Sequence, residues 1–371
     1  MYRKPRGFRV INQKTGSMIE TLPIDIQKIQ KSKLPETDMD NPVFGRVYSD
    51  HMFVADYYDG DWQDLRIVPY GDLSLSPANT TLHYASTIFE GLKAHRASND
   101  DILVFRPQAN AKRMVNSAKR MCMPPVPEEL FMQAMTELIK LDRDWVPGKD
   151  GTSLYIRPFA FATDPFIGIR PSDTYKFLII TGPVGAYYSK PVRVKIEKHY
   201  TRAAAGGIGF AKTGGNYAAA LYPAVKAQKE GYDQLIWTDG VKHEFVEESG
   251  TMNLMFVIND TLLTAPTGDT ILPGITRDSI LQLARDKGMK VEERRISVKE
   301  VIDAIEKGTL QEAFGAGTAA TIAHISAIGY EGKDYELPSV ESRKYSNEFL
   351  QVLTDIKLGN IEDPHGWIYK I

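Results

Sequence analysis

The sequence predicts a mixed α+β protein with two domains. Its 371 residues exceed the length at which a single hydrophobic core usually keeps growing. Short runs that alternate apolar and polar residues, as half-buried strands do, are interspersed with stretches whose apolar residues recur at helical spacing. With 43% hydrophobic and 25% charged residues, the composition is that of an ordinary globular protein.

Charge and cysteine content exclude several classes of protein. Lys and Arg total 45 against 47 Asp and Glu, so the bulk charge predicts neither a nucleic-acid nor a membrane partner. No apolar run approaches about 18 residues, and the amino terminus lacks the apolar segment of a signal peptide. The single cysteine, Cys122, excludes intramolecular disulfides and multi-cysteine metal sites. We expect Cys122 to be buried and inert, no metal to be bound, and the protein to be cytoplasmic.

The first half of the chain predicts strands and helices in turn. Alternating patterns indicate strands at 47–57 and 101–105, and helical spacing indicates helices within 106–121 and 127–141. A strongly apolar strand, "DTYKFLIITGPVG", then runs out into Gly, Pro and Ser before a new alternating pattern begins. We therefore predict an N-terminal domain at 1–182, a linker at 183–190 and a C-terminal domain at 191–371, with the first forty residues lying on the surface.

The second half predicts a helix after Asn216 that ends near Gly231, followed by three strands in "DQLIWTDG", "HEFVEES" and "TMNLMFVIND". Another helix, in "PGITRDSILQLARDKG", starts next to Gly274 and stops at Gly288. The segment "SVKEVIDAIEKG" opens with Ser297 and Glu300, the spacing of a capping box.

The stretch "GGIGFAKTGGNY" at 206–217 contains Lys212, for which the sequence allows several interpretations. It comes close to the phosphate-binding pattern G-x-x-x-x-G-K-[ST], but Ala211 replaces the second glycine and no apolar strand precedes it, which disfavours an ATPase. Lys212 could otherwise be an ordinary surface lysine. The small residues around it favour a third role, because they give room to a flat ligand, and desolvation frees a lysine amine to form an imine.

Pyridoxal phosphate is the flat ligand that suits such a lysine, and it makes further demands. It needs a phosphate cup, a carboxylate at the pyridine nitrogen and a hydrogen bond to its phenolic oxygen. The sequence offers Glu248 in a strand-turn-strand context, Thr276 at a helix N-terminus and Thr318 in the small-residue turn "GAGTAA". Each signal is weak alone, and their presence in one half of the chain favours this cofactor.

Several motifs, in a fixed order, resemble those of the branched-chain amino-acid aminotransferases, which belong to fold-type IV of the pyridoxal phosphate enzymes. The motifs are "LHYASTIFEGLKAHR", "FRPQANAKRM", "LYIRPF", "KTGGNYAAAL", "EESGTMNLMFV", "ILPGITRDSI" and "GAGTAA". The resemblance covers nearly the whole chain and fades at the two ends. It implies a smaller N-terminal α/β domain, a larger C-terminal domain with a pseudo-barrel of strands, and a site between them.

The resemblance also implies which residues bind the cofactor. Lys212 matches the lysine that forms the Schiff base and moves the proton between the substrate Cα and the cofactor C4′. Tyr217 matches the tyrosine at the phenolate oxygen, and Glu248 the acid at the pyridine nitrogen. The other cofactor-binding positions implied are Arg106, Ile275, Thr276 and Thr318 at the phosphate, with Arg202 and Thr251 beside the cofactor.

For the substrate, the resemblance implies an aromatic side-chain pocket and groups for the carboxylates. The aromatic positions are Phe44, Tyr84, Phe89, Tyr155 and Tyr217, and the carboxylate positions are Arg157, Thr251, Thr318 and Ala319. An apolar pocket favours aliphatic side chains by about 0.8 kcal/mol per buried methylene. The implied reaction is reversible, ping-pong amino transfer between L-leucine, L-isoleucine or L-valine and 2-oxoglutarate, which becomes L-glutamate, in a homodimer.

Rival readings remain. A D-amino-acid aminotransferase and a 4-amino-4-deoxychorismate lyase share the implied fold, and a nucleotide-binding ATPase or a non-catalytic relative would belong to other classes. Ala320 and Ala323 stand where mammalian members carry a C-x-x-C pair, which excludes a thiol switch at that place. The ranking of leucine, isoleucine and valine stays open, as does the direction in which a cell runs the reaction.

Overall fold

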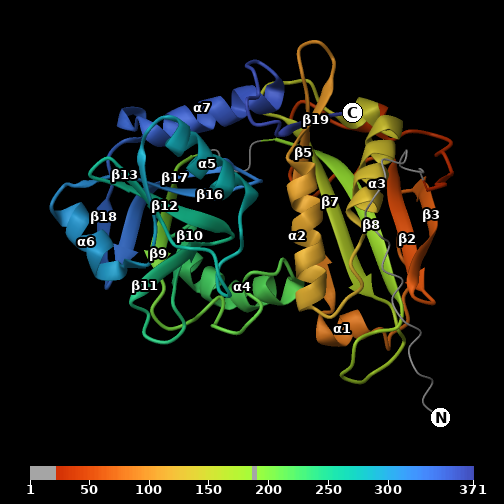
Figure 1. Cartoon of the computed structure of the whole chain (residues 1–371), viewed down its shortest axis with the longest axis horizontal. Helices are drawn as coiled ribbons and strands as arrows, with labels where there is room; N and C mark the ends of the chain where they lie inside the picture. The colour runs from red at the N-terminus through yellow and green to blue at the C-terminus, as the bar shows by residue number, and fades with distance from the viewer. Residues whose placement is uncertain (1–21, 186–189) are drawn as a thin grey trace, which may run out of the picture.

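Two β-sheets form the framework of the protein, in a computed structural model that describes residues 22–185 and 190–371 (Figure 1). The strands of the first sheet run in the order β1-β3-β2-β8-β7-β5-β6-β19, and β4 pairs with β7 beside this path. Their bounds are β1 Asp25–Ile26, β2 His51–Tyr58, β3 Asp61–Pro69, β4 Thr87–Phe89, β5 Leu92–Arg96, β6 Ile102–Phe105, β7 Ser153–Ala162, β8 Tyr175–Val184 and β19 Ile368–Lys370.

Helices α2 (Pro107–Arg120) and α3 (Glu128–Leu141) cover one face of this sheet. Their apolar faces pack on the sheet through fully buried side chains such as Phe131, which lies against Phe177 of β8. Removing each such aromatic side chain from water contributes about 1.5–3 kcal/mol. The same sheet also carries the short helix α1 (Thr80–Tyr84) and the 3-10 turns η1 (Leu34–Glu36) and η2 (Arg143–Trp145).

The second sheet closes on itself. Its order is β14-β13-β12-β16-β17-β9-β10-β11-β15, and an additional pairing of β11 with β12 joins β12-β16-β17-β9-β10-β11 into a ring. The fold class is thereby confirmed as mixed α+β with a barrel-like sheet. The strands are β9 Val192–Ile196, β10 Gln234–Thr238, β11 Phe245–Ser249, β12 Met252–Ile258, β13 Thr261–Thr264, β14 Lys290–Glu293, β15 Ile296–Ser297, β16 Leu310–Gly317, β17 Thr321–Tyr330 and β18 Lys333–Glu336.

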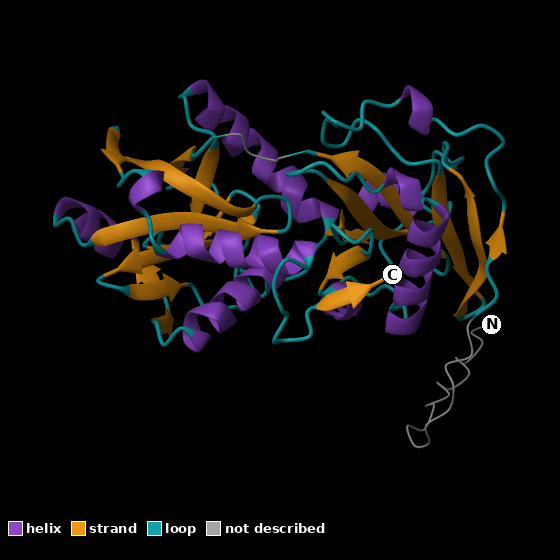
Figure 2. Ribbon diagram, turned by 90° about the horizontal axis from the view of Figure 1, so that it is seen from above, coloured by secondary structure: helices purple, strands orange, loops and turns teal. Residues whose placement is uncertain are grey.

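Four helices pack around this barrel: α4 (Gly214–Lys229), α5 (Ile275–Asp286), α6 (Val298–Glu306) and α7 (Tyr345–Leu358). The 3-10 turn η3 (Val340–Ser342) precedes α7. Helix α7 runs along the top of Figure 1 from the barrel toward the first sheet, and the chain then ends in β19, which pairs with β6. Figure 2 shows the same return, with the C-terminus lying beside the first sheet. The last strand of the chain therefore ties the second half of the protein to the first sheet.

Most elements that the sequence predicts are confirmed within a few residues. The helices at 106–121, 127–141 and next to Gly274, and the three strands after 231, all form. Half of the predicted capping box forms, because Ser297 Oγ accepts from Glu300 N while the Glu300 carboxylate pairs with Arg294. The predicted domain limits of 1–182, 183–190 and 191–371 stay a prediction, and residues 186–189 of that linker lie outside the described residues.

The prediction for Cys122 is wrong. The cysteine is exposed, with a positive φ of 54° just after α2 ends. The left-handed turn points this side chain outward while Met123, one residue later, is buried. Apolar neighbours in the sequence just after a helix end therefore do not by themselves predict burial.

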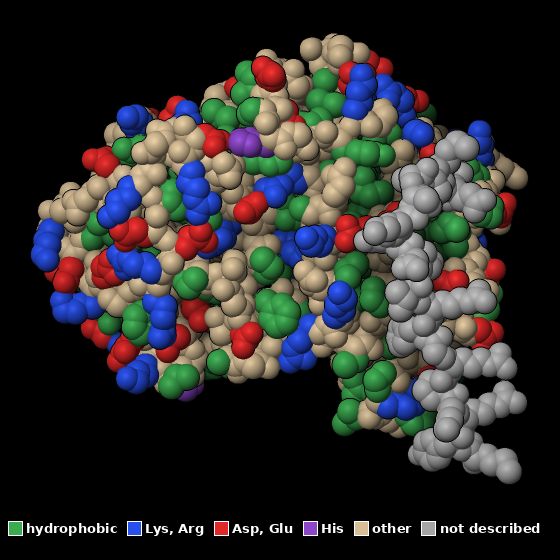
Figure 3. Space-filling view, viewed as in Figure 1, with side chains coloured by type: hydrophobic (Ala, Val, Ile, Leu, Met, Phe, Trp, Pro, Cys, Tyr) green, Lys and Arg blue, Asp and Glu red, His purple; other side chains and the backbone are tan. Residues whose placement is uncertain are grey.

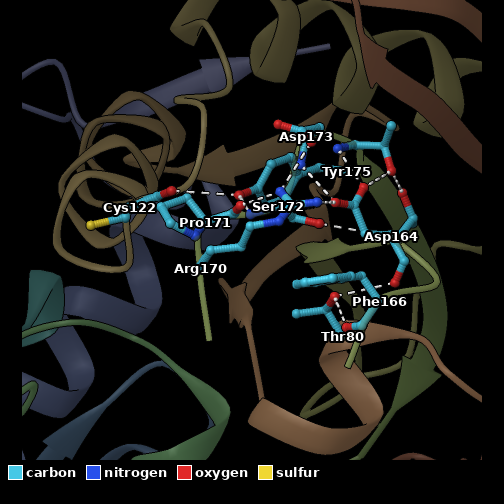
Figure 4. A network of polar contacts seen from close by, with 11 residues as sticks. Thr80, Cys122, Asp164, Phe166, Arg170, Pro171, Ser172, Asp173 and Tyr175 are labelled. Carbon is cyan, nitrogen blue, oxygen red and sulfur yellow. Dashed lines mark hydrogen bonds and ion pairs between the residues drawn. The ribbon is translucent and has the colours of Figure 1, made fainter. Parts of the chain in front are cut away.

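A loop between β7 and β8 is held by one buried carboxylate, Asp164 (Figure 4). Burial alone would raise the pKa of Asp164, but hydrogen bonds from Thr174 and from the backbone of Asp173 hold the pKa below its ordinary value. Thr80 of α1 donates to the carbonyl of Phe166 at 3.2 Å, which fixes α1 next to the loop. The loop nevertheless presents apolar side chains to solvent, and Ile169 is 94% exposed.

The outer surface carries charges of both signs. Figure 3 shows basic and acidic side chains interspersed over one face, in keeping with the nearly balanced composition. Within residues 22–185 and 190–371, no helix combines the length and the apolar character that a membrane span requires.

Candidate active site

Lys212 lies at the junction of the two sheets, two residues before α4 begins. Its backbone is fixed on both sides, because its N–H donates to Ser117 Oγ of α2 at 3.0 Å and its carbonyl accepts from Phe89 N at 3.0 Å. Its Nζ donates to the Tyr217 hydroxyl at 2.7 Å and lies 4.9 Å from the centre of the Phe89 ring. The amine is thus held next to a phenol in an aromatic, half-buried place and is not turned toward bulk solvent.

Glu248 faces Lys212 from the barrel and is 3% exposed. It forms an ion pair with Arg202 and accepts hydrogen bonds from Asn253 Nδ2 at 2.9 Å and from Leu272 N at 3.0 Å. Burial raises the pKa of Glu248 to about 7, although the Arg202 guanidinium favours the charged form. The carboxyl group is therefore poised to exchange a proton at neutral pH.

The glycines before Lys212 have a different role from the one that the sequence indicates. Gly206 and Gly207 do not line the central cavity, and Gly209 lines only a small cavity next to it. A Cβ on Gly209 would lie 2.6 Å from Ala203 Cβ and 2.7 Å from the Asp269 carbonyl oxygen. The loop needs glycine because two chain segments cross closely there.

The N-terminus of α5 contributes free backbone N–H groups to the site. Gly274 precedes the helix with no side chain capping it, and Ile275 and Thr276 form its first turn. A Cβ on Gly274 would lie 1.8 Å from Asn253 Oδ1, so only glycine permits this approach to the barrel. Thr318, in the turn between β16 and β17, lies across from this helix end. The arrangement is a ready anion site.

Arg113, which was not predicted from the sequence, lines the cavity beside this helix end, whereas Arg106, the arginine predicted to hold the phosphate, contacts α5 outside the cavity. Arg106 does not line the cavity, because its guanidinium pairs with Asp278 at 2.7 Å and donates to Ser279 Oγ at 2.7 Å. Arg113 does line it, held in a two-point ion pair with Glu90 at 2.8 and 2.7 Å. Two features of the sequence could have indicated Arg113: it lies on the inward face of α2, and Glu90 is an acid within the apolar run "TIFEGL".

The opposite wall is aromatic. Phe44 packs edge-on against Tyr155 with ring centres 4.9 Å apart, and Phe89 lies 4.9 Å from Tyr217. Arg157 donates to the Tyr155 hydroxyl at 2.9 Å and stacks over Phe89, and its buried Nε has no hydrogen-bond partner within the described chain. This buried donor faces the cavity, so a ligand group or a water molecule could complete its bonding.

These groups surround one cavity of about 230 Å³. Most of the site residues predicted from the sequence line this cavity. Arg106, Arg202 and Tyr84 do not line it, and Tyr84 of α1 is 39% exposed. Arg202 instead forms an ion pair with the Glu248 carboxylate from outside the cavity. The lining is Phe44, Phe89, Gly91, Arg113, Tyr155, Arg157, Lys212, Tyr217, Glu248, Thr251, Met252, Asn253, Leu272, Gly274, Ile275, Thr276, Ala316, Gly317, Thr318, Ala319 and Ala320.

The residues present fit a phosphorylated pyridine aldehyde. An arginine and a helix N-terminus lie at one side of the cavity for an anion, and a buried carboxyl group lies where a ring nitrogen could meet it. Between the anion site and the carboxyl group lie the Lys212 amine and the Tyr217 phenol, which are hydrogen-bonded to each other. Within the described residues there is no group of three or more metal-ligating side chains.

Comparison with known proteins agrees with this chemistry. The sequence pattern of the class IV aminotransferases matches residues 87–328. This chain belongs to that family. Branched-chain-amino-acid transaminase 1 of Bacillus subtilis is 44% identical over 333 residues, which cover 88% of this chain and 94% of that protein. The branched-chain-amino-acid aminotransferase of Mycolicibacterium smegmatis is 42% identical, covering 91% of this chain and 94% of that protein. These relatives confirm the resemblance that the motifs indicate.

Solved structures of this family share the fold. The branched-chain amino acid aminotransferase of Escherichia coli superimposes with a TM-score of 0.71 at 27% identity, covering 86% of this chain and 98% of that one. The enzyme of Thermoproteus uzoniensis, solved with norvaline, gives a TM-score of 0.70 at 26% identity, covering 86% and 99%. A third branched-chain amino acid aminotransferase, complexed with N-(5′-phosphopyridoxyl)-L-glutamate, gives 0.68 at 25% identity, covering 85% and 97%.

The raised pKa of Glu248 gives a testable pH dependence in the cofactor-free protein. A carboxyl group whose folded pKa lies above its unfolded value binds more protons when folded, so its contribution to stability falls as pH rises between 4.5 and about 7. Glu248→Gln removes this loss. We expect the melting temperature of Glu248→Gln, relative to that of the wild type, to rise between pH 5 and pH 8. The corresponding change in the free energy of unfolding is at most about 3 kcal/mol.

Loss of the ion pair with Arg202 in Glu248→Gln changes the overall stability, so the difference between the slopes of the two pH profiles is the quantity that tests the prediction. Differential scanning calorimetry at several pH values measures the effect, and Glu244→Gln, at an exposed position near the same strand, is the matched control. Parallel pH profiles for wild type and Glu248→Gln would contradict the prediction.

Proposed function

We propose that this class IV aminotransferase reversibly transfers the amino group between L-leucine, L-isoleucine or L-valine and 2-oxoglutarate, giving the branched 2-oxo acid and L-glutamate. The observation that carries the proposal is the meeting of the Lys212 amine, the Tyr217 hydroxyl and the Glu248 carboxyl group in one cavity with an aromatic wall. The relatives that bear the name of this activity support it.

Pyridoxal 5′-phosphate, when bound, would supply the electron sink that stabilises negative charge at the substrate Cα. Arg113 and the backbone N–H groups of Ile275 and Thr276 would hold its phosphate. The Glu248 carboxylate would accept a hydrogen bond from the protonated ring nitrogen, with Arg202 keeping that carboxylate oriented. Lys212 would hold and move the proton at the reacting carbon, with its amine positioned by Tyr217.

Two kinds of substrate would share the cavity in turn, as a ping-pong reaction requires. The Phe44, Phe89 and Tyr155 rings would bury an aliphatic side chain and exclude water from it. The Thr318–Ala319 turn and Thr251 would receive the α-carboxylate. Arg157 would bind the distal carboxylate of glutamate, since its buried Nε has bonding capacity left over.

We further propose that the protein is a homodimer and that it is cytoplasmic. Tyr84 lies outside the cavity of its own chain, next to the loop that Asp164 anchors. Leu82 and Tyr84 of α1 and Phe166, Ile167 and Ile169 of the adjoining loop, together called the apolar patch here, have exposed side chains, and Ile167 is 63% and Ile169 94% exposed. A patch of this kind suits burial against a second copy. The exposed, unpaired Cys122 suits a reducing compartment.

Replacing Lys212 tests the function directly. We expect Lys212→Ala to abolish amino transfer from L-leucine to 2-oxoglutarate, because no other amine among the cavity-lining residues can replace it. Borohydride treatment of the cofactor-loaded wild type should attach the cofactor to the peptide that contains Lys212, as mass spectrometry would show. Lys226→Ala, at an exposed position on α4, should keep full activity. Full turnover by Lys212→Ala, or a colourless protein that binds ATP, would refute the proposal; preference for D-alanine would select the D-amino-acid rival.

Replacing Arg157 should affect the two kinds of substrate differently. Because its guanidinium is proposed to meet only the distal carboxylate, Arg157→Gln should raise the KM for 2-oxoglutarate by about ten- to a hundredfold, as loss of a charged hydrogen bond does. The KM for L-leucine should change by much less. Steady-state kinetics with each substrate varied in turn measures both, and equal changes in the two values would contradict this assignment.

The dimer is checked by its mass in solution. Sedimentation velocity of the wild type should give twice the chain mass of 41.6 kDa. Ile169→Asp should weaken the dimer, because it places a charge in the apolar patch. Val241→Asp, at a position that is 84% exposed and far from the patch in sequence, is the control and should leave the dimer intact. A monomeric wild type would rule the proposal out.

A further inference from the structure

A second cavity lies behind the turn that carries Thr318 and Ala319. Its volume is about 210 Å³, and it shares Ala319 and Ala320 with the candidate active site. A small cavity of about 20 Å³ adjoins both, with Thr276 and Thr318 on one side. The larger cavity is lined by Lys93, His95, Gly151, Ser153, Ala319, Ala320, Thr321, Ile322, Leu350, Thr354, Lys357 and Leu358.

Two secondary-structure elements direct basic side chains into this cavity. Lys93 and His95 are two residues apart on β5, so the strand places both on one face while Leu92 and Ala94 enter the core. Lys357 comes from the last turn of α7, the helix that bridges the barrel and the first sheet in Figure 1, and it is 8% exposed. The cavity therefore exists only where the two halves of the protein meet.

Within residues 22–185 and 190–371, Lys93 and Lys357 have neutral hydrogen-bond partners only. Lys93 Nζ donates to the Ala319 carbonyl at 2.6 Å, and Lys357 Nζ donates to Thr321 Oγ1 at 2.7 Å and lies over the Phe105 ring. None of the residues that line this cavity or the small one beside it is an aspartate or a glutamate. Each ammonium group has three donors, so most of their bonding capacity is left over.

Burial disfavours the charged forms of the three basic side chains, Lys93, His95 and Lys357. Burial lowers the pKa of Lys93 to about 8. Burial and the nearby Lys93 charge lower the pKa of Lys357 to about 7, and burial with both lysines lowers that of His95 to about 3. A packing role alone would be met by uncharged side chains of similar length, which carry no desolvation cost. An anion between the two lysines would stabilise their charged forms.

We propose that this cavity binds a small oxyanion with two negative charges, a dicarboxylate or an inorganic phosphate or sulfate, between the ammonium groups of Lys93 and Lys357. Ser153 and Thr321 line the same space and offer hydroxyl groups to the remaining oxygens, whereas the Thr354 hydroxyl already donates to the Leu350 carbonyl at 2.7 Å. The binding site does not depend on the proposed function. Through Lys93, it contacts the Ala319 carbonyl of the turn that also lines the candidate active site.

Sulfate is the first probe, because it does not titrate near neutral pH. Isothermal titration calorimetry of the cofactor-saturated protein at pH 8 should detect sulfate binding. Lys357→Met, which keeps the length of the side chain and removes its charge, should weaken binding by at least about tenfold, as loss of one charged partner does. Lys226→Met, the same substitution at an exposed lysine on α4, should bind like the wild type.

Proton uptake is a second readout. At pH 8 a Lys357 amine with a pKa of about 7 is mostly neutral, and an adjacent dianion raises that pKa, so binding should take up a proton. Lys93 and His95 are the other titratable groups that line the cavity. Titrations in two buffers with different ionisation enthalpies measure the uptake, and Lys357→Met should lose most of it.

Competition identifies the class of ligand. Succinate and inorganic phosphate are each titrated against sulfate, with succinate also tested in Arg157→Gln so that binding in the candidate active site is not counted. Displacement by either one supports the site and selects its class. No sulfate binding by the wild type, or equal binding by wild type and Lys357→Met, overturns the proposal. If Lys357→Met does not fold, sulfate protection of Lys357 against an amine acylating reagent, read by mass spectrometry, decides instead.

Discussion

The pairing of β11 with β12 is the constraint on which the site depends. Glu248 lies opposite Asn253 in this pairing, which closes the ring of barrel strands and brings the Asn253 amide onto the carboxylate. The connecting turn contains Gly250 with a φ of +55°, and a Cβ there would lie 2.2 Å from Gln234 Oε1. A closed ring leaves no free edge and fixes its register. A shift of one residue would turn Glu248 away from Arg202 and leave both charges without their partner.

Helix α2 carries the second half of the arrangement, because it links the first sheet to the barrel. Ser117 holds the backbone of Lys212, and Arg113 reaches the Pro273 carbonyl just before α5. Glu90, which is fully buried, pairs with Arg113 at two points and thereby keeps its guanidinium fixed toward the cavity. The amine and the anion-binding end of the cavity are therefore positioned by one rigid element, so their separation does not depend on a flexible loop.

Sequence reasoning succeeded where chemistry is local and failed where it is shared between distant segments. The small residues around Lys212 and the clear beginning of the helix at Gly274 are local signals, so both features were predictable, whereas Tyr217 was implied only by the family resemblance. Arg106 and Arg113 lie in the same motif and both are arginines. Only the acids that they meet, Asp278 for one and Glu90 for the other, decide which one faces the cavity. Those acids are distant in sequence, and nothing local assigns them.

The sequence by itself determined the mixed α+β class, most of the helices and strands, and the residue types from which a pyridoxal phosphate site is built, because periodicity and caps act over a few residues. The tertiary structure decided the closure of the barrel, the return of β19 to the first sheet, the presence of Arg113 and not Arg106 in the cavity lining, and the gathering of Lys93, His95 and Lys357. Each of these outcomes depends on contacts between segments far apart in the chain. Burial, and with it the pKa of a carboxyl group such as Glu248, has a value only after those contacts form.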